Sequence, residues 1–210
     1  VTFTPGQDNL NGGGGTDVLA LYGPGIFDLN SLVGYAGFEE QRLFNSSGAL
    51  ASLVLRNGTT TSVAASGTGP TQTFLNGTAS ATTIQGGDGS DSIFLQGTGN
   101  VTTFVGGNGS NSVGLSSSGT LGTFQGGSGT DVISVNNPAA WNSNLVFDGG
   151  SGGFDRLDLN VGGTFNLAAA TLTGVEQLRL NVSNTTAIVD ADAIAQVTSL
   201  SGVAGAKLVT

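Results

Sequence analysis

Acidic side chains recur in this chain at one fixed place in a glycine-rich turn. The turn GGDGSD ends at Asp91, GGSGTD ends at Asp131, and GGGGTD ends at Asp17. A carboxylate held beside the carbonyls of a tight turn offers oxygen ligands, which a hard cation such as Ca²⁺ takes. The chain contains no Cys, Met or His, which excludes thiolate, thioether and imidazole ligands. Oxygen coordination of a hard cation is therefore the metal chemistry that the composition leaves open.

These turns belong to a repeat of twenty residues, because 73–92, 93–112 and 113–132 align without a gap and 53–72 fits before them. Each period holds two short apolar runs and two turns. Alternation in the first run predicts one inward-facing set of side chains. The second run ends in another apolar set. These sets are Ile93, Leu95, Val113, Leu115, Ile133 and Val135, and Ile84, Phe104 and Phe124.

Two strands in every twenty residues predict one coil of a solenoid, with neighbouring coils about 4.8 Å apart. We therefore predict an all-β fold, a right-handed parallel β-solenoid (β-roll or β-helix) with coils of about 20 residues. A single elongated domain would cover 1–210. Its parts would be N-terminal coils over 1–52, regular repeats over 53–135, a protruding loop over 136–147, and C-terminal coils over 148–210.

A second, longer repeat relates the two ends of the chain. The segment 149–181 aligns with 12–45, so that Asp155 matches Asp17, Glu176 matches Glu39 and Arg179 matches Arg42. The glutamates and arginines favour structural ion pairs or contacts at coil edges. Between the regular repeats and this second copy, NNPAAWNSN adds three residues to the period. We expect Trp141 near the tip of the loop that it forms.

The pattern G-G-x-G-x-D-x-U-x, in which U is apolar, resembles the calcium-binding nonapeptide of repeats-in-toxin proteins. The chain has it at 86–94 and 126–134, with Gly in third place at 12–20, with Asn for Asp at 106–114, and with one inserted residue at 149–159. The units 12–45 and 149–181, with GFEEQRL and GVEQLRL, are also similar to a module of large bacterial surface, surface-layer and adhesin-type proteins.

The resemblance implies that carboxylates and carbonyls of stacked turns hold Ca²⁺ between coils. The motif occurs once per coil here, whereas family arrays carry it twice, so only one side of the roll would hold ions. The alternative is a set of glycine turns capped by Asx hydrogen bonds, with no ion. The implied metal-site residues are Asp91, Asp131, Asp17, Asp155, Asp88, Asn111 and the carbonyls of Gly86, Gly106 and Gly126.

Charge and composition argue against several functions. The net charge is −9, and the five basic residues are scattered, so no basic surface is expected for nucleic acid. No apolar run reaches the ~18 residues of a membrane span. Without His or Cys, the usual nucleophile triads cannot form, and no pair of acids marks a cleft. We therefore expect no enzyme activity, no nucleic-acid binding and no membrane insertion.

The expected function is structural, in a protein secreted to the bacterial cell surface or extracellular matrix. Two roles remain open: a module of a larger adhesin or surface-layer protein, or the subunit of an extracellular filament. The β-prone, weakly charged ends Val1–Thr4 and Lys207–Thr210 predict self-association end to end or by strand exchange. An adhesin that binds a surface, a glycan or, through Thr83, Thr103 and Thr123, ice is the alternative.

Overall fold

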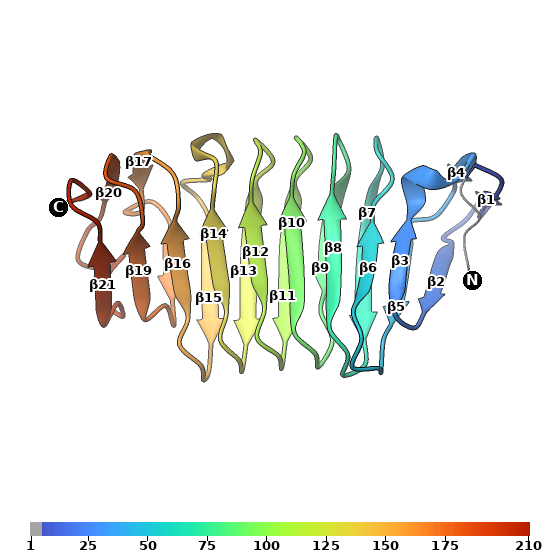
Figure 1. Cartoon of the computed structure of the whole chain (residues 1–210), viewed down its shortest axis with the longest axis horizontal. Helices are drawn as coiled ribbons and strands as arrows, with labels where there is room; N and C mark the ends of the chain where they lie inside the picture. Colours follow the sequence, from blue (N-terminus) through green and yellow to red (C-terminus); the bar gives the residue numbers. More distant parts are fainter. Residues whose placement is uncertain (1–5) are drawn as a thin grey trace.

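The computed structural model describes residues 6–210 of the 210-residue chain as a single row of stacked coils (Figure 1). The coils have about 21 residues and make about 10 turns, which confirms the predicted parallel β-solenoid. Within 6–210 the helices are two short 3-10 segments, η1 (Leu29–Ser31) and η2 (Pro138–Ala140). No helix in that range has the length and hydropathy needed to cross a membrane. The predicted strand-forming end Val1–Thr4 lies outside the described residues.

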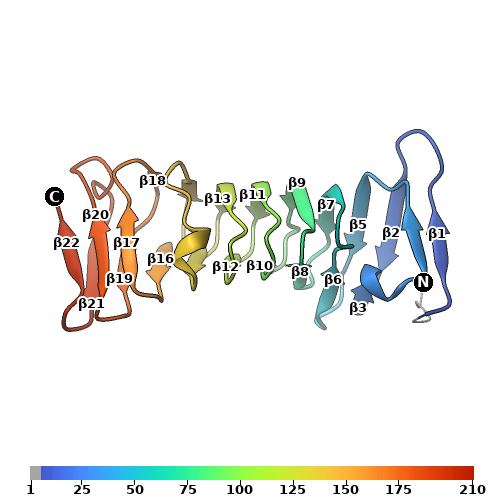
Figure 2. The same ribbon diagram turned by 90° about the horizontal axis from the view of Figure 1, so that it is seen from above.

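Two long parallel sheets form the flanks of the solenoid, and most coils give one strand to each (Figure 2). Within residues 6–210, the nine-stranded sheet contains, in spatial order, β3 (Gly25–Asp28), β6 (Ala51–Val54), β8 (Thr71–Leu75), β10 (Asp91–Leu95), β12 (Ser112–Leu115), β14 (Val132–Val135), β16 (Arg156–Leu159), β19 (Gln177–Leu180) and β21 (Ser199–Gly202). The eight-stranded sheet contains β2 (Val18–Tyr22), β5 (Glu40–Phe44), β7 (Thr60–Ser66), β9 (Ser80–Gln85), β11 (Val101–Gly107), β13 (Leu121–Gly127), β15 (Val146–Gly150) and β18 (Thr171–Thr173).

The end coils have a third side that the regular coils lack. In the described part of the chain, β1 (Asn9–Asn11) pairs with β4 (Gly34–Ala36) at the N-terminal end. At the C-terminal end β20 (Thr185–Ile188) lies between β17 (Gly163–Asn166) and β22 (Lys207–Val209). The longer coils at the two ends have room for this extra strand, which the twenty-residue repeats do not contain.

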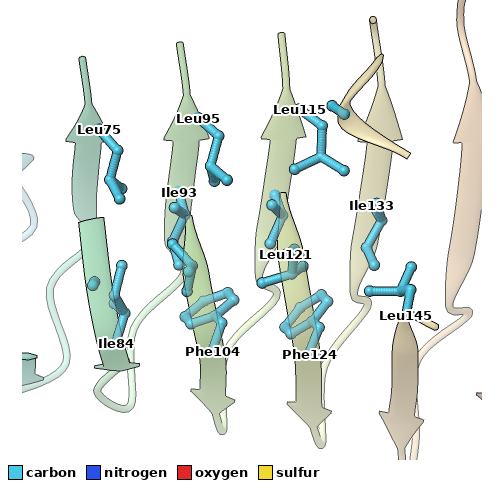
Figure 3. Packing of buried hydrophobic residues seen from close by; sticks show 14 of the residues in the cluster. Leu75, Ile84, Ile93, Leu95, Phe104, Leu115, Leu121, Phe124, Ile133 and Leu145 are labelled. Atoms are coloured by element: carbon cyan, nitrogen blue, oxygen red, sulfur yellow. The ribbon is translucent and has the colours of Figure 1, made fainter. Parts of the chain in front are cut away.

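The core is a set of apolar columns that run along the solenoid between the two sheets (Figure 3). Ile93 pairs with Val113 and Val113 with Ile133, and the predicted inward set is at most 1% exposed. From the other sheet, Phe104, Phe124 and Phe147 stack with ring centroids 4.8 and 5.2 Å apart. Each such side chain contributes about 1.5–3 kcal/mol by burial. The alternation seen in the sequence therefore correctly predicts the core.

The loop after β14 differs from the prediction for Trp141. The Trp141 indole packs edge-on against Phe165, with ring centroids 6.0 Å apart, and lies against the core. The preceding Ala140 is fully buried, and the Asn137 side chain caps η2 by accepting from the Ala139 N–H. The inserted residues fold back over the third side of the coil, because a large apolar ring gains more by burial than by exposure at a loop tip.

Candidate functional site

The predicted metal turns that end at Asp91, Asn111, Asp131 and Asp155 lead into strands of the nine-stranded sheet and form one column, whereas the turn that ends at Asp17 leads into the eight-stranded sheet. Thr71, Asp91, Asn111, Asp131, Asp155 and Glu176 occupy equivalent positions in successive coils, directly before or at the start of their strands. Asp91, Asn111, Asp131 and Asp155 are at most 3% exposed. Carboxylates are seldom fully buried without partners. The stability of the column therefore depends on what each side-chain oxygen contacts.

One oxygen of each side chain accepts a hydrogen bond from the backbone of the preceding coil. The five bonds, from donor N–H to acceptor oxygen, are Thr71 to Asp91 Oδ1 (3.2 Å), Asp91 to Asn111 Oδ1 (3.1 Å), Asn111 to Asp131 Oδ1 (2.8 Å), Asp131 to Asp155 Oδ1 (2.7 Å) and Asp155 to Glu176 Oε2 (2.7 Å). We call this run of residues 71, 91, 111, 131, 155 and 176 the turn ladder. It satisfies turn N–H groups that would otherwise be buried without an acceptor.

The first glycine of each motif makes room for the turn ladder. A Cβ on Gly106 would collide with the Asn111 amide and would lie 2.6 Å from the carbonyl oxygen of Gly126 in the next coil. A Cβ on Gly126 would collide with the Asp131 carboxylate and would lie 2.6 Å from the Gly149 carbonyl oxygen. The glycine and the Asx residue of GGxGxD are thus sterically coupled, whether or not an ion is bound.

The coils differ in what the second polar atom of each ladder side chain contacts. In Asp91, Oδ2 accepts from the Gly87 N–H at 2.8 Å, while Oδ1 also accepts from the Thr71 hydroxyl. In Asn111, the Nδ2 amide donates to the Gly109 carbonyl at 2.8 Å and to the Gly126 carbonyl at 3.4 Å. Both side chains are therefore satisfied by protein groups alone.

Asp131 lacks such a partner. Its Oδ2 atom is buried and has no hydrogen-bond donor among the described residues. The position corresponds to that of the Asn111 Nδ2 atom, beside the turn carbonyl of the next coil, here Gly149. A buried carboxylate oxygen without a donor is costly, and a proton or a bound cation would lower that cost. Of the predicted metal residues on the ladder, Asp131 therefore fits a cation best.

Burial also alters the acid strength of these side chains. It raises the pKa of Asp91 and of Asp131 above the ordinary carboxyl range, against the opposing effect of their hydrogen bonds. Burial raises the pKa of Asp155 to about 6, and the negative charge of Asp131 adds to that increase. The two neighbouring acids, one coil apart, thus disfavour each other's charge.

Other residues implied by the resemblance lie elsewhere. Asp17 precedes β2 in the eight-stranded sheet and is separated from the turn ladder. Asp88 is exposed, and its Oδ1 accepts from the Asn108 side chain at 2.6 Å. Among residues 6–210, no three side chains of the His, Cys, Asp and Glu types come together as a metal-binding group. Any cation on the ladder would rely on backbone carbonyls in addition to Asp131.

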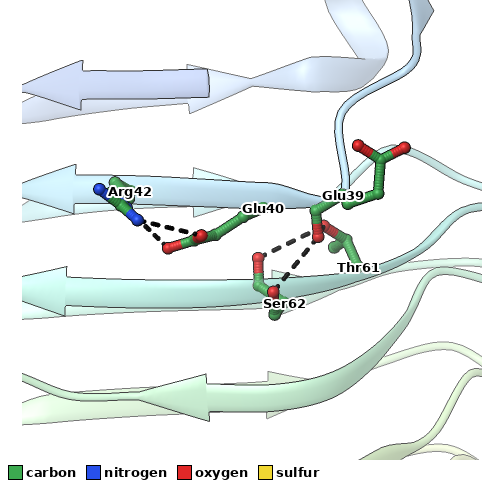
Figure 4. Close-up of polar contacts among 5 residues, drawn as sticks. All are labelled: Glu39, Glu40, Arg42, Thr61 and Ser62. Atoms are coloured by element: carbon green, nitrogen blue, oxygen red, sulfur yellow. Dashed lines mark hydrogen bonds and ion pairs between the residues drawn. The ribbon is translucent and has the colours of Figure 1, made fainter. Parts of the chain in front are cut away.

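Two glutamates that the sequence suggested as ion-pair partners have another role. Glu39 accepts from the Asp17 N–H at 2.8 Å, as Glu176 does from Asp155. The Glu39 carbonyl accepts from the hydroxyls of Thr61 and Ser62, and Arg42 pairs with Glu40 at 2.7 Å (Figure 4). Glu39 and Glu176 therefore make structural contacts between coils, but each carboxylate accepts from a backbone N–H and, within residues 6–210, does not pair with an arginine. The match between segments 12–45 and 149–181 was the signal that could have identified it.

Comparison of the chain with family models, with curated proteins and with solved structures found no match. The parallel coils and glycine turns are consistent with a β-roll of the repeats-in-toxin type at the level of the fold.

Proposed function

We propose that the protein is a non-catalytic structural element of the bacterial cell surface or extracellular matrix, built to join end to end into a filament or layer. The observation that carries this proposal is an exposed apolar edge on the last coil of the described residues. Leu200 continues an inner column of the nine-stranded sheet in register with Leu178, yet it is 55% exposed. Beyond β18, the eight-stranded sheet has no further strand in the described chain to face it.

An apolar hollow of about 160 Å³ marks this end. It is lined by Leu178, Ile194, Val197, Leu200 and Leu208. An exposed apolar edge of this kind is covered in solenoids by a polar cap or by another coil. The side chains are those of an interior, so a further coil is the better complement.

The coil that would cover this edge can come from the N-terminal side of a second copy, which presents three edge strands. Within 6–210, the N-terminal edges are β1, β2 and β3, and the C-terminal edges are β22, β18 and β21, on corresponding sides of the solenoid. Stacking the N-terminal end of one copy on the C-terminal end of another would place parallel edges together on each side. Such a head-to-tail contact is heterologous, and it generates a filament where the rotation between copies does not close a ring.

Calcium is a second component of the proposal. If the nonapeptide function is retained, we infer that Asp131 Oδ2 and the Gly149 carbonyl hold the ion, which would supply positive charge between two coils. Asp91 and Asn111 would not take part, because donors and acceptors of the protein already satisfy them. The expected result is one stabilised turn and not a continuous row of ions. A melting temperature that is the same in calcium and in chelator would refute this component.

The test of assembly is a matched pair of variants. Leu200→Asp places a charge in the open end, whereas Leu50→Asp places one on a similarly exposed leucine, 40% exposed, in the turn before β6. Sedimentation velocity and negative-stain electron microscopy should show filaments or oligomers for the wild type and Leu50→Asp, and monomers for Leu200→Asp. A wild type that stays monomeric at high concentration, with and without calcium, contradicts the proposal.

A further inference from the structure

An interrupted aromatic stack lies on the outer face of the nine-stranded sheet. Phe74 of β8 and Phe94 of β10 are neighbours in register and stack with ring centroids 5.0 Å apart and planes 16° apart. The next position along the column is Gly114 of β12, and the one after that is Ser134 of β14. One face of the Phe94 ring is therefore covered by Phe74, while its other face is turned towards Gly114, which has no side chain.

The missing side chain leaves a hollow in the surface. Its volume is about 260 Å³, and its walls include Phe94, Ser112, Gly114, Ser116, Ser134 and Asn136. A Cβ on Gly114 would lie 3.2 Å from Cδ1 of Phe94, so the glycine keeps the floor open and lets the ring lie close to β12. Gly114 lies within a regular strand and its φ is not positive. Glycine is thus not needed there for backbone conformation.

Asn136 and Asn160 line this hollow and belong to a chain of amides that continues to Asn181. Asn181 Nδ2 donates to Asn160 Oδ1 at 2.7 Å, Asn160 Nδ2 donates to Asn136 Oδ1 at 3.1 Å, and Asn136 Nδ2 donates to the Ser134 carbonyl at 3.4 Å. Each amide nitrogen carries two hydrogens, and the chain uses one of them. On the far side, the Ser112 hydroxyl lies 2.8 Å from that of Ser92. The rim therefore combines neutral donors and acceptors with an aromatic wall.

We propose that this hollow binds one ring of a neutral sugar, a hexopyranose unit of a glycan. A pyranose has a face of C–H groups that fits the bare ring of Phe94, and an edge of hydroxyls that can pair with serines and asparagines. No charged side chain lines the hollow among the described residues, which disfavours phosphate and acidic sugars as ligands. A purely apolar partner would bury hydroxyl and amide groups without hydrogen bonds, which is costly.

This site is independent of end-to-end assembly, because it lies on β10, β12 and β14 in the middle of the solenoid (Figure 1). A filament would display it once per copy along its flank. Many weak sites on one filament can bind a polymeric glycan much more strongly than a single site does.

The experiment uses the whole chain and a defined panel of probes: cellopentaose, maltopentaose, mannopentaose and, as the charged counterpart, tri-galacturonic acid. Saturation-transfer NMR identifies binding, and titration of the side-chain amide signals of Asn136 and Asn160 locates it. We expect at least one neutral oligosaccharide to bind and to shift these two amides. If no neutral oligosaccharide binds, if only the charged sugar binds, or if the shifts lie elsewhere, the proposal is wrong.

Three variants complete the test. Phe94→Ala removes the wall and should weaken binding about tenfold. Gly114→Phe should continue the stack once the Phe94 ring shifts by a few tenths of an ångström, and it should fill the hollow and abolish binding in a protein that still folds. Thr123→Ala, on the outer face of the opposite sheet, is the control and should bind as the wild type does. Unchanged binding in a folded Gly114→Phe protein would overturn the proposal, as would loss of binding in the control.

Discussion

Replacing Asp131 by Asn is a direct test of the turn ladder. The substitution keeps the shape of the side chain, and the new Oδ1 can still accept from the Asn111 N–H. The new Nδ2 replaces the unpartnered Oδ2 and can donate to the Gly149 carbonyl, as Asn111 does to Gly126. A buried polar atom without a partner costs about 1–3 kcal/mol. In chelator at pH 7.5, Asp131→Asn should therefore raise the free energy of unfolding by about 1–3 kcal/mol.

The assay is urea unfolding followed by circular dichroism, with thermal melts beside it, where each kcal/mol corresponds to about 2–4 °C for a chain of this size. The reciprocal variant Asn111→Asp is the matched control. It places a carboxylate oxygen beside the Gly109 and Gly126 carbonyls and should destabilise by a similar amount. If calcium binds at Asp131, adding it should stabilise the wild type but not Asp131→Asn. If Asp131→Asn is less stable than the wild type in chelator, then Asp131 Oδ2 is not a buried oxygen without a hydrogen-bond donor, and the reasoning is wrong.

Three further predictions concern pH, the core and the glycine column. The pKa of Asp155 is 3.8 in the unfolded chain and about 6 in the folded protein, so the folded protein binds this proton more tightly. Deprotonation of Asp155 therefore lowers the free energy of unfolding. This loss of stability is absent below pH 4 and complete above pH 6. It amounts to at most about 3 kcal/mol, and Asp155→Asn should abolish this part of the pH dependence of urea unfolding. Phe124→Ala should cost about 3–5 kcal/mol in the same assay, because it leaves a cavity between Phe104 and Phe147; a loss below about 1 kcal/mol would contradict the packing. Gly106→Ala should cost about 1–3 kcal/mol by overpacking against Asn111 and Gly126, whereas Gly48→Ala, with no atom within 4 Å of its Cβ, should be close to neutral in thermal melts.

The sequence predicted the parts of this fold that depend on period alone. A spacing of twenty residues brings Ile93, Val113 and Ile133 into one column, and alternation decides that they face inward. The period does not say on which flank a motif lies, so Asp17 was grouped with Asp91 although they begin strands of different sheets. The two end units match in sequence, but the strand after the glycine turn belongs to a different flank in each.

The chemistry of the turn was harder to predict than its geometry. Both an ion site and a hydrogen-bond ladder require a glycine for space and an Asx residue for its oxygen, so GGxGxD is compatible with either. What distinguishes them is the second polar atom of each side chain. In Asp91, Oδ2 accepts from the Gly87 N–H, whereas in Asp131 of the same motif Oδ2 has no donor among the described residues. Such a difference depends on the local conformation of each turn, which residue types do not reveal.

The turn ladder also has a direction along the chain. In every one of its bonds the backbone N–H of one coil donates to a side chain of the following coil. A ribosome releases the amino end first, so each turn emerges before the side chain that will complete it. We therefore expect nascent chains to order with a lag of one coil, roughly twenty residues behind the exit site. An altered ladder residue should then disturb the coil made before it, so its effect on nascent-chain order should appear upstream of the change.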